Sequence, residues 1–361
     1  MDDCFVLFRF PSSGNECHFM TCREEELVLS MSYEDCGKCE GFVFAPFETS
    51  VNLPIVIFPK SKYQTFEIDE VRKLSLDVLY TQIECFAPSK TTAELRQVYH
   101  NGFLHFQSAL HRDIIRKAVL SRAEYAEIKG HIDISSTFIA ACRDNPDSFV
   151  AFVSSKVTGT WLLATPEVLV EKAQDGWHTI ALAGTQPRNT CMGNLSGDIA
   201  ELWDAKNIEE QKLVASYISD KLAPYTNELT AERPFTVQAG NLLHIRTDFY
   251  FEVIPSLSNP LGKIMADLHP TPAVCGFPAD DALALVNEVE RCDRQYYSGF
   301  CGMIENEKVF RLYVTLRCTR IYSDYLVFYA GGGILPESEE EKEWAETEMK
   351  MQTIKNCIKF R

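Results

Sequence analysis

The first 60 residues alternate short apolar runs with polar and turn-forming residues, a pattern typical of antiparallel strands. The apolar runs span residues 5–8, 27–29, 41–46 and 55–58. We predict a strand at each of them. Residues 60–90 are mixed and polar, and no hydrophobic period there favours a helix over a strand.

Farther along the chain, apolar positions recur with helical spacing. A helix is predicted from Thr91 or Thr92 to about Arg112, because a threonine N-cap with Glu94 in the first turn is a helix-start signal. Its apolar positions recur every three or four residues: Leu95, Val98, Tyr99, Phe103, Phe106 and Leu110. Other helices are predicted at residues 135–142, at 198–222, and from Asp280 or Asp281 to Arg291.

Short apolar runs between these helices predict more strands. They lie at residues 117–122, 149–153, 160–164, 178–182 and 241–247. Two further strands, the first containing Arg317 and the second ending in a glycine triplet at 331–333, precede a terminal helix. No internal repeat, low-complexity tract or Gly/Ser linker divides the chain. These features favour a single mixed α+β domain.

The composition narrows the choice of partners. The chain has 361 residues, is 46% hydrophobic and carries a net charge of −16, so it can bury a large core and would repel nucleic acid. A small-molecule partner is expected instead. The sequence has no basic leader and no run of about 18 apolar residues, so we expect a soluble cytoplasmic protein that does not bind a membrane.

The cysteines indicate a reducing compartment. There are 13 of them, an odd number without framework spacing, which favours free thiols over disulfides. Cys36 and Cys39 form one C-x-x-C pair. No second pair lies nearby, so this spacing does not favour a zinc site.

Helical spacing places one carboxylate among apolar neighbours. Glu210 shares a face of its predicted helix with Trp203, Val214 and Tyr217. A carboxylate that points inward requires a partner. That partner is either Lys206, one turn earlier on the same helix, or a metal ion.

The terminal helix carries a second set of charges. Glu343, Glu346 and Lys350 lie on one stripe of it. A solvated pair between Glu346 and Lys350 would explain this stripe without a ligand. Carboxylates from two helices also suit Mg²⁺, which takes few protein oxygens, keeps several waters and accepts an oxygen from a substrate carboxylate.

Two features predict a site for an anion. Arg317 lies in an apolar strand and is costly to bury unless it meets an acid, either a ligand carboxylate or a structural aspartate. Gly331, Gly332 and Gly333 end the next strand. They either present backbone N–H groups to an anion or form a simple turn.

Lys117 and Glu167 are candidates for acid–base chemistry. Both lie among apolar residues. Burial favours a neutral amine, which can accept a proton, and a protonated carboxylic acid, which can donate one. The alternative for Lys117 is a strand-edge lysine whose charged end reaches water.

Taken in order, these motifs resemble the chorismate-utilising enzymes, the family of anthranilate, aminodeoxychorismate, isochorismate and salicylate synthases. The matching segments are the Glu210 helix and residues 117–122, 164–169, 182–185, 243–244, 268–273, 276–278, 297–302, 314–318, 329–334 and 343–347. The resemblance implies one anthranilate synthase-like domain in which two packed antiparallel sheets are surrounded by helices. Residues 91–361 would form its chorismate-binding catalytic region, and residues 1–90 a variable N-terminal part.

The resemblance also implies roles for single residues. Lys117 matches the base that activates water for attack at C2 of chorismate, and Glu167 matches the acid that protonates the departing C4 hydroxyl. Glu210 and Glu346 match the Mg²⁺ ligands, with Glu343 close by as a direct or indirect ligand. The remaining matches anchor the substrate carboxylates or line the pocket: Gly184, Thr185, His244, Ala273, Val274, Gly276, Arg317, Gly331, Gly332, Gly333 and Lys350.

Two positions separate the subtypes of this family. Anthranilate-forming members carry glutamine at the position of Lys117, and aminodeoxychorismate-forming members carry lysine at the position of Ala183. The resemblance therefore implies water as the nucleophile and no glutaminase subunit. The expected activity is isomerisation of chorismate to isochorismate by a monomer, for menaquinone or siderophore synthesis. The alternatives are salicylate synthesis, which adds pyruvate elimination, and a non-catalytic chorismate-binding protein.

The chain departs from the family pattern at a few positions. Gln211 stands where the family usually has histidine, and Gly332 stands where alanine is common. Arg246 and Asp248 add charges that we expect near the pocket. The sequence assigns neither of them a role.

Overall fold

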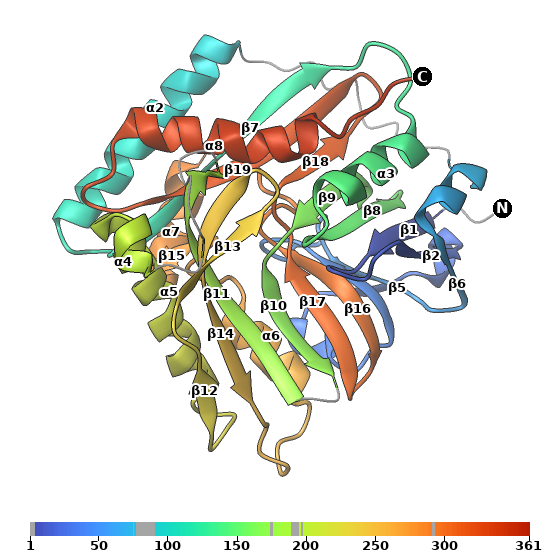
Figure 1. The fold of residues 1–361 in the computed structure, drawn as a ribbon, viewed down its shortest axis with the longest axis horizontal. Coiled ribbons are helices and arrows are strands. Elements are labelled where there is room, and N and C mark those ends of the chain that lie inside the picture. The colour runs from blue at the N-terminus through green and yellow to red at the C-terminus, as the bar shows by residue number, and fades with distance from the viewer. Residues whose placement is uncertain are drawn as a thin grey trace.

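Two antiparallel sheets pack face to face in the computed structural model of this chain, and helices cover their outer faces (Figure 1). The structure describes residues 4–74, 76, 91–173, 176–188, 195, 198–290 and 293–361. Strands from residues 4–74 belong to both sheets. The predicted α+β fold with two packed antiparallel sheets is confirmed.

The strands follow one another in space in an order different from their order in sequence. The 9-stranded sheet runs β15 (Gly276–Phe277), β7 (Lys117–Glu127), β19 (Tyr325–Ile334), β18 (Cys318–Ile321), β9 (Gly159–Thr165), β8 (Phe149–Ser155), β1 (Cys4–Arg9), β2 (Glu16–Cys22) and β6 (Lys62–Glu67). The 10-stranded sheet runs β12 (Leu229–Ala231), β14 (Leu242–Phe251), β11 (Gly176–Pro187), β10 (Val168–Ala173), β17 (Val309–Val314), β16 (Phe300–Asn306), β4 (Gly41–Ala45), β5 (Ile55–Phe58) and β3 (Val28–Ser30), with β13 (Phe235–Ala239) paired to β14.

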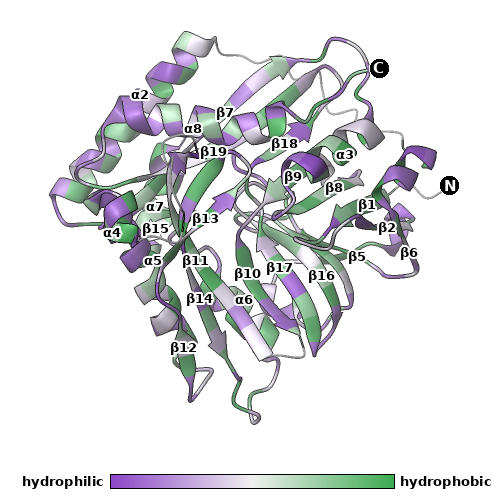
Figure 2. Ribbon diagram, viewed as in Figure 1, coloured by the Kyte–Doolittle hydropathy of each residue, from purple (hydrophilic) through white to green (hydrophobic). Residues whose placement is uncertain are grey.

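An aromatic core fills the space between the sheets. Phe8, Phe149 and Trp161 of the 9-stranded sheet belong to one buried cluster with Phe42 and Tyr313 of the 10-stranded sheet. The rings of Phe149 and Tyr313 stack across the interface with centroids 4.3 Å apart. Figure 2 shows that the strands are mainly hydrophobic, whereas polar residues gather on helices and loops. Burial of these rings stabilises the packing of the two sheets.

Helices cover the outer faces of the sheets. They are α1 (Tyr33–Cys36), α2 (Thr92–His111), α3 (Ile134–Asp144), α4 (Ile199–Leu202), α5 (Ala205–Leu222), α6 (Pro260–Leu268), α7 (Ala279–Val289) and α8 (Glu340–Lys355), with 3₁₀ turns η1 (Glu24–Glu26) and η2 (Ile68–Lys73). Helix α5 packs on β11, α3 packs on β8, and α2 and α7 pack on β7. In the described part of the chain, no helix combines the length and the apolar character needed to cross a membrane.

The predicted start of α2 is confirmed in detail. The side chain of Thr91 accepts the backbone N–H of Glu94, and the carboxylate of Glu94 accepts the backbone N–H of Thr91 at 2.5 Å. This reciprocal arrangement satisfies two N–H groups that a helix start leaves unpaired.

The predicted helix at 198–222 is wrong as a single element. It breaks after Leu202, and α5 begins at Ala205 because Asp204 caps it by accepting the N–H of Asn207 at 2.8 Å. At the break, the indole N–H of Trp203 donates to Thr236 Oγ1 at 2.9 Å. A tertiary contact and a strong cap thus override a continuous helical period.

Other boundaries also differ from the predictions. Helix α7 follows Pro278, so Asp280 and Asp281 lie in its first turn and do not cap it. Residues 260–268 and 168–173 form α6 and β10, which the sequence patterns did not predict. Residues 75, 77–90, 189–194, 196 and 197 lie outside the described residues.

Candidate active site

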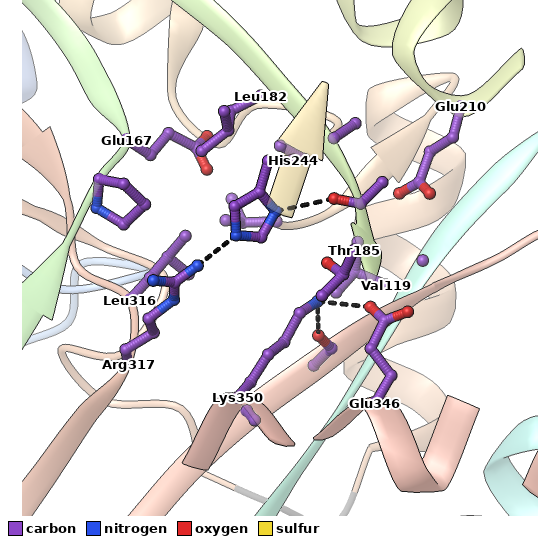
Figure 3. A pocket seen from close by; sticks show the side chains of 18 of the residues that line it. Val119, Glu167, Leu182, Thr185, Glu210, His244, Leu316, Arg317, Glu346 and Lys350 are labelled. Carbon is purple, nitrogen blue, oxygen red and sulfur yellow. Dashed lines mark hydrogen bonds and ion pairs between the residues drawn. The ribbon is translucent and has the colours of Figure 1, made fainter. Parts of the chain in front are cut away.

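One cavity lies where β11, β14 and β19 approach α5 and α8 (Figure 3). Most of the predicted site residues line it: Glu167, Gly184, Thr185, Glu210, His244, Ala273, Val274, Arg317, Gly331, Gly333, Glu346 and Lys350. Figure 3 shows Glu167 and Arg317 on one side of the cavity. Glu210 and Glu346 lie on the opposite side. The fold therefore brings together residues that lie as far apart in the sequence as Glu167 and Lys350.

A β-bulge shapes one wall of the cavity. The register of β11 against β14 shifts between Ala183 and Gln186. Gly184 at this point has φ +70°, a conformation that glycine adopts without strain. The shift leaves the carbonyl of Gly184 facing His244, whose Nδ1 lies 2.7 Å from it. The bulge thereby orients the imidazole toward the cavity.

His244 is a neutral acceptor for Arg317. Its Nδ1–H donates to Gly184, so its Nε2 accepts a hydrogen bond from Nη2 of Arg317. Burial and the charge of Arg317 hold the pKa of His244 well below its usual range, consistent with the neutral form. The imidazole therefore fixes the guanidinium without neutralising it.

Arg317 is a buried cation facing the cavity. It is 6% exposed and lies between β17 and β18 with φ +47°, so it is not inside a strand as predicted. Nη1 donates to the carbonyl of Ala239 at 3.3 Å. Burial lowers the pKa of Arg317 to about 10, although Glu167 opposes this shift. No ion pair to a described carboxylate balances the guanidinium, which favours a ligand anion over a structural aspartate.

Glu167 is a buried carboxyl held by its backbone between β9 and β10. Its N–H donates to Thr165 Oγ1 at 3.3 Å, and its carbonyl accepts the N–H of Val314 at 2.9 Å. Burial raises the pKa of Glu167 to about 7, even though Lys117 and other nearby cations oppose the shift. A substantial fraction of this carboxyl therefore carries a proton near neutral pH.

Lys117 begins β7 and is completely buried. Its Nζ lies 2.9 Å from Oε1 of Glu210. Lys117 therefore reaches the cavity through Glu210 and does not itself line it within the described part of the chain. The alternative of a lysine that extends to water is wrong.

The lysine pairs differ from the predicted ones. Lys206 contacts Oε1 of Glu343 and leaves Glu210 to Lys117, so the proposed pair one turn apart on α5 is absent from the described contacts. Lys350 forms the predicted pair with Glu346 at 2.7 Å. This pair lines the cavity and is only partly exposed, in contrast to the solvated stripe we considered.

Three carboxylates are candidates for metal binding. Oε2 of Glu343 is buried without a hydrogen-bond partner, and burial together with the nearby charge of Glu346 raises the pKa of Glu343 to about 7. Glu210 and Glu346 line the cavity, whereas Glu343 lines an adjoining one. The described residues contain no preformed cluster of three or more metal-ligating side chains. Two or three carboxylate ligands suit Mg²⁺, which completes its shell with water and substrate oxygens.

The glycine triplet lies inside β19, opposite β7, and does not form a turn. A Cβ at Gly333 would lie 2.3 Å from Oε1 of Glu210, and one at Gly332 would lie 3.1 Å from Oε2 of Glu343. Glycine is therefore needed because the carboxylates approach the strand closely. The carbonyl of Gly331 accepts a hydrogen bond from Lys350 Nζ at 2.8 Å.

Two predicted pocket residues do not line the cavity. Gly332 is absent from the lining, and a Cβ there would lie 3.1 Å from Oε2 of Glu343. Gly276 has φ +151°, and a Cβ there would lie 2.4 Å from the carbonyl of Lys117, so its role is close strand approach.

The positions without an assigned role take part in structural contacts. Arg246 pairs with Asp248, which accepts a hydrogen bond from His178 at 2.6 Å. Gln211 donates to the carbonyl of Ala181 at 3.0 Å, which ties α5 to β11. The thiols of Cys36 and Cys39 contact backbone carbonyls.

The sequence patterns did not predict several residues of the cavity. Val119, Leu316, Tyr297 and Tyr329 line the cavity but were not predicted as site residues. Tyr297 and Tyr329 are the first residues of two segments that match the family, 297–302 and 329–334, so the resemblance could have identified them. Lys206 was considered only as a partner for Glu210, because periodicity cannot reveal contacts to another helix.

Both a family model and the sequences of individual proteins match this chain. Residues 69–359 match the family described as "Chorismate binding enzyme". The vibriobactin-specific isochorismate synthase of Vibrio cholerae serotype O1 is 31% identical over 258 residues, which cover 71% of this chain and 65% of that protein. The chain thus spans less than two thirds of the length of this relative.

Solved structures share the fold. MenF, the menaquinone-specific isochorismate synthase from Escherichia coli, superposes with a TM-score of 0.76 at 19% identity, covering 99% of this chain and 89% of MenF. Anthranilate synthase component I from Streptococcus pneumoniae TIGR4 gives 0.67 at 14% identity, covering 91% of this chain and 80% of that chain.

Proposed function

This chain belongs to the family of chorismate-binding enzymes, and we propose that it is an isomerase that converts chorismate to isochorismate. The proposal draws on the relative named as an isochorismate synthase and on the chemistry of the cavity. Lys117 and Ala183 support water as the nucleophile, and the proposed enzyme needs no glutaminase subunit.

The observation that carries this proposal is the opposition of charges across the cavity. Arg317, a cation without a carboxylate partner among the described ion pairs, and Glu167, an acid whose pKa is about 7, lie on one side. Glu210 and Glu346, each paired with a lysine, lie on the other. A small dicarboxylate with a hydroxyl leaving group fits such a cavity, because it needs a cation, an acid and a base.

The proposed reaction requires two proton transfers. Lys117, as the base, accepts a proton from the water that attacks C2 of chorismate. Glu167 donates its proton to the C4 hydroxyl, which leaves as water while the ring double bond shifts. The C2–O bond forms and the C4–O bond breaks, so one water is consumed and one released.

The remaining residues bind and orient the substrate. Arg317 would form a bidentate contact with one carboxylate, and His244 fixes the guanidinium for this role. Glu210 and Glu346, with Glu343 close by, would hold Mg²⁺. When bound, this ion supplies positive charge for the ring carboxylate.

We also propose a cytoplasmic location and a monomeric state, with chorismate and isochorismate as ligands and no nucleic-acid partner. Described cysteines such as Cys17, Cys142 and Cys275 are free thiols, which suits a reducing compartment. The net charge of −16 argues against nucleic acid.

Chromatography of chorismate after incubation with the full chain and Mg²⁺ tests the function. Isochorismate as the main product supports the proposal. Salicylate with pyruvate would instead identify a salicylate synthase, and unchanged chorismate would identify a non-catalytic binding protein. A parallel reaction with EDTA should form no product.

A further inference from the structure

We propose that the buried ion pair between Glu290 and Arg294 is a positioning device for the active site. It holds the segment of β7 that follows Lys117 against the cavity wall at Val274. This role rests on the proposed function, because it concerns the placement of the proposed base.

The pair is almost completely buried, and two hydrogen bonds join its side chains. The side chains of Arg294 and Glu290 are 3% and 4% exposed. Nε of Arg294 donates to Oε2 of Glu290 at 2.7 Å, and Nη2 lies 2.5 Å from Oε1. The guanidinium also lies 4.3 Å above the ring of Phe47. Such a planar, bidentate contact fixes both side chains in one geometry.

Where the edge strand β15 ends, the side chains of Glu290 and Arg294 take over its hydrogen bonds to β7. β15 pairs with β7 only at Lys117 and Ala118. Beyond them, Nη2 of Arg294 donates to the carbonyl of Val119 at 2.8 Å. Oε1 of Glu290 accepts the N–H of Ser121 at 2.7 Å. One side chain therefore supplies the donor, and the other the acceptor, that a neighbouring strand would supply.

The same guanidinium reaches a second part of the cavity. Its Nη1 donates to the carbonyl of Val274 at 2.6 Å. Val119 and Val274 both line the cavity, and the N–H of Val119 donates to the carbonyl of Cys275 at 2.7 Å. Arg294 therefore ties two cavity walls to each other at their backbones.

A purely stabilising role does not explain this arrangement. A buried ion pair is often no more stabilising than two apolar side chains of similar volume. Apolar side chains, however, cannot bond to the backbone of Val119, Ser121 and Val274. Release of these three groups would let β7 move beside Lys117, and small displacements of a catalytic group are costly to the rate.

The test compares four forms of the full chain: the unchanged protein, Arg294→Met, the double variant Glu290→Leu with Arg294→Met, and Arg9→Met as a control. Arg9 is also 3% exposed and donates to two backbone carbonyls, at 2.6 Å and 3.0 Å. It ends β1, which β19, β18, β9 and β8 separate from β7 in the 9-stranded sheet. Thermal unfolding, kcat and KM for isochorismate formation, and amide hydrogen exchange are measured for each form.

If the pair positions the active site, the double variant should recover thermal stability without recovering kcat. Arg294→Met should lower the Tm because it leaves Glu290 buried and unpaired. The double variant should recover much of the Tm, yet kcat should remain lower by on the order of 10- to 100-fold with little change in KM. Arg9→Met should lower the Tm and leave kcat unchanged. Recovery of kcat together with the Tm in the double variant would overturn the proposal.

Hydrogen exchange separates this proposal from the proposed function. In the double variant, the N–H of Ser121 should exchange faster because it loses its acceptor. Unchanged exchange at Ser121 would overturn the tether whether or not the chain is active. A wild-type chain that forms no isochorismate would instead overturn the proposed function.

Discussion

The side-chain nitrogen of Lys117 lies 2.9 Å from Oε1 of Glu210, and both side chains lie in the protein interior. The contact joins the proposed base to a proposed metal ligand. It also links the first residue of β7 to the second turn of α5. The proposed base and the proposed metal ligand therefore belong to one site.

Replacement of Lys117 tests this relationship. Lys117→Ala removes the proposed base and leaves the carboxylate of Glu210 buried without its partner. We expect isochorismate formation to fall by roughly 100-fold or more. We also expect a loss of about 3 kcal/mol in the free energy of unfolding. Product chromatography and chemical denaturation measure the two effects.

One outcome would contradict the role of Lys117 as the base, and a second lysine variant serves as the control. Turnover near the wild-type rate in Lys117→Ala would mean that another group is the base. Lys212→Ala, which removes an exposed lysine on α5, should change neither quantity.

Glu167 should make stability depend on pH. Its ordinary pKa is 4.5 and its folded pKa is about 7, so the folded carboxyl keeps a proton that the unfolded chain releases between these values. The free energy of unfolding should therefore fall as pH rises from 4.5 to 7, by about 3 kcal/mol in total. Glu167→Gln should lack this fall. Urea denaturation at pH 5 and pH 8 measures it, and an identical pH dependence in both proteins would contradict the buried, protonated state.

Arg317 should act in substrate binding. Arg317→Lys keeps a positive charge but loses the planar fork that binds a carboxylate through two bonds. Charge-assisted hydrogen bonds are worth about 1.5 to 3 kcal/mol, so we expect KM for chorismate to rise by roughly 10- to 100-fold. Initial-rate kinetics measure this change. An unchanged KM would show that the guanidinium does not contact the substrate.

Two neighbouring glycines should differ in their tolerance of a methyl group. Gly333→Ala would place a Cβ 2.3 Å from Oε1 of Glu210, whereas Gly332→Ala would place one 3.1 Å from Oε2 of Glu343. The first substitution must displace the Glu210 carboxylate, and the second requires only a small adjustment. Titration of activity with Mg²⁺ should show a larger rise in the required Mg²⁺ concentration for Gly333→Ala. Equal effects would mean that strand β19 does not shape the proposed metal site.

Local patterns predicted the elements that local interactions determine. The capping box of Thr91 and Glu94 fixed the start of α2, and apolar runs located most strands. The break before α5 was missed because Trp203 bonds to Thr236, a residue far along the chain. Arg317 was placed in a strand because its neighbours are apolar, although β17 ends at Val314.

Site geometry depended on contacts that spacing cannot reveal. Lys117 and Glu210 are 93 positions apart, since 210 − 117 = 93, and periodicity offered Lys206 as the nearer partner. The glycine triplet was interpreted as a turn or an anion site because its sequence does not show which carboxylates approach it. The family resemblance supplied the candidate residues, and tertiary packing determined their pairing.

The most direct test of the account follows the oxygen of the solvent. The chain is incubated with chorismate and Mg²⁺ in ¹⁸O-labelled water, and the product is analysed by mass spectrometry. Addition of water at C2 and loss of the C4 hydroxyl predict isochorismate with one ¹⁸O atom, located at C2. Isochorismate that contains only the original oxygen atoms, or no isochorismate at all, would contradict the account.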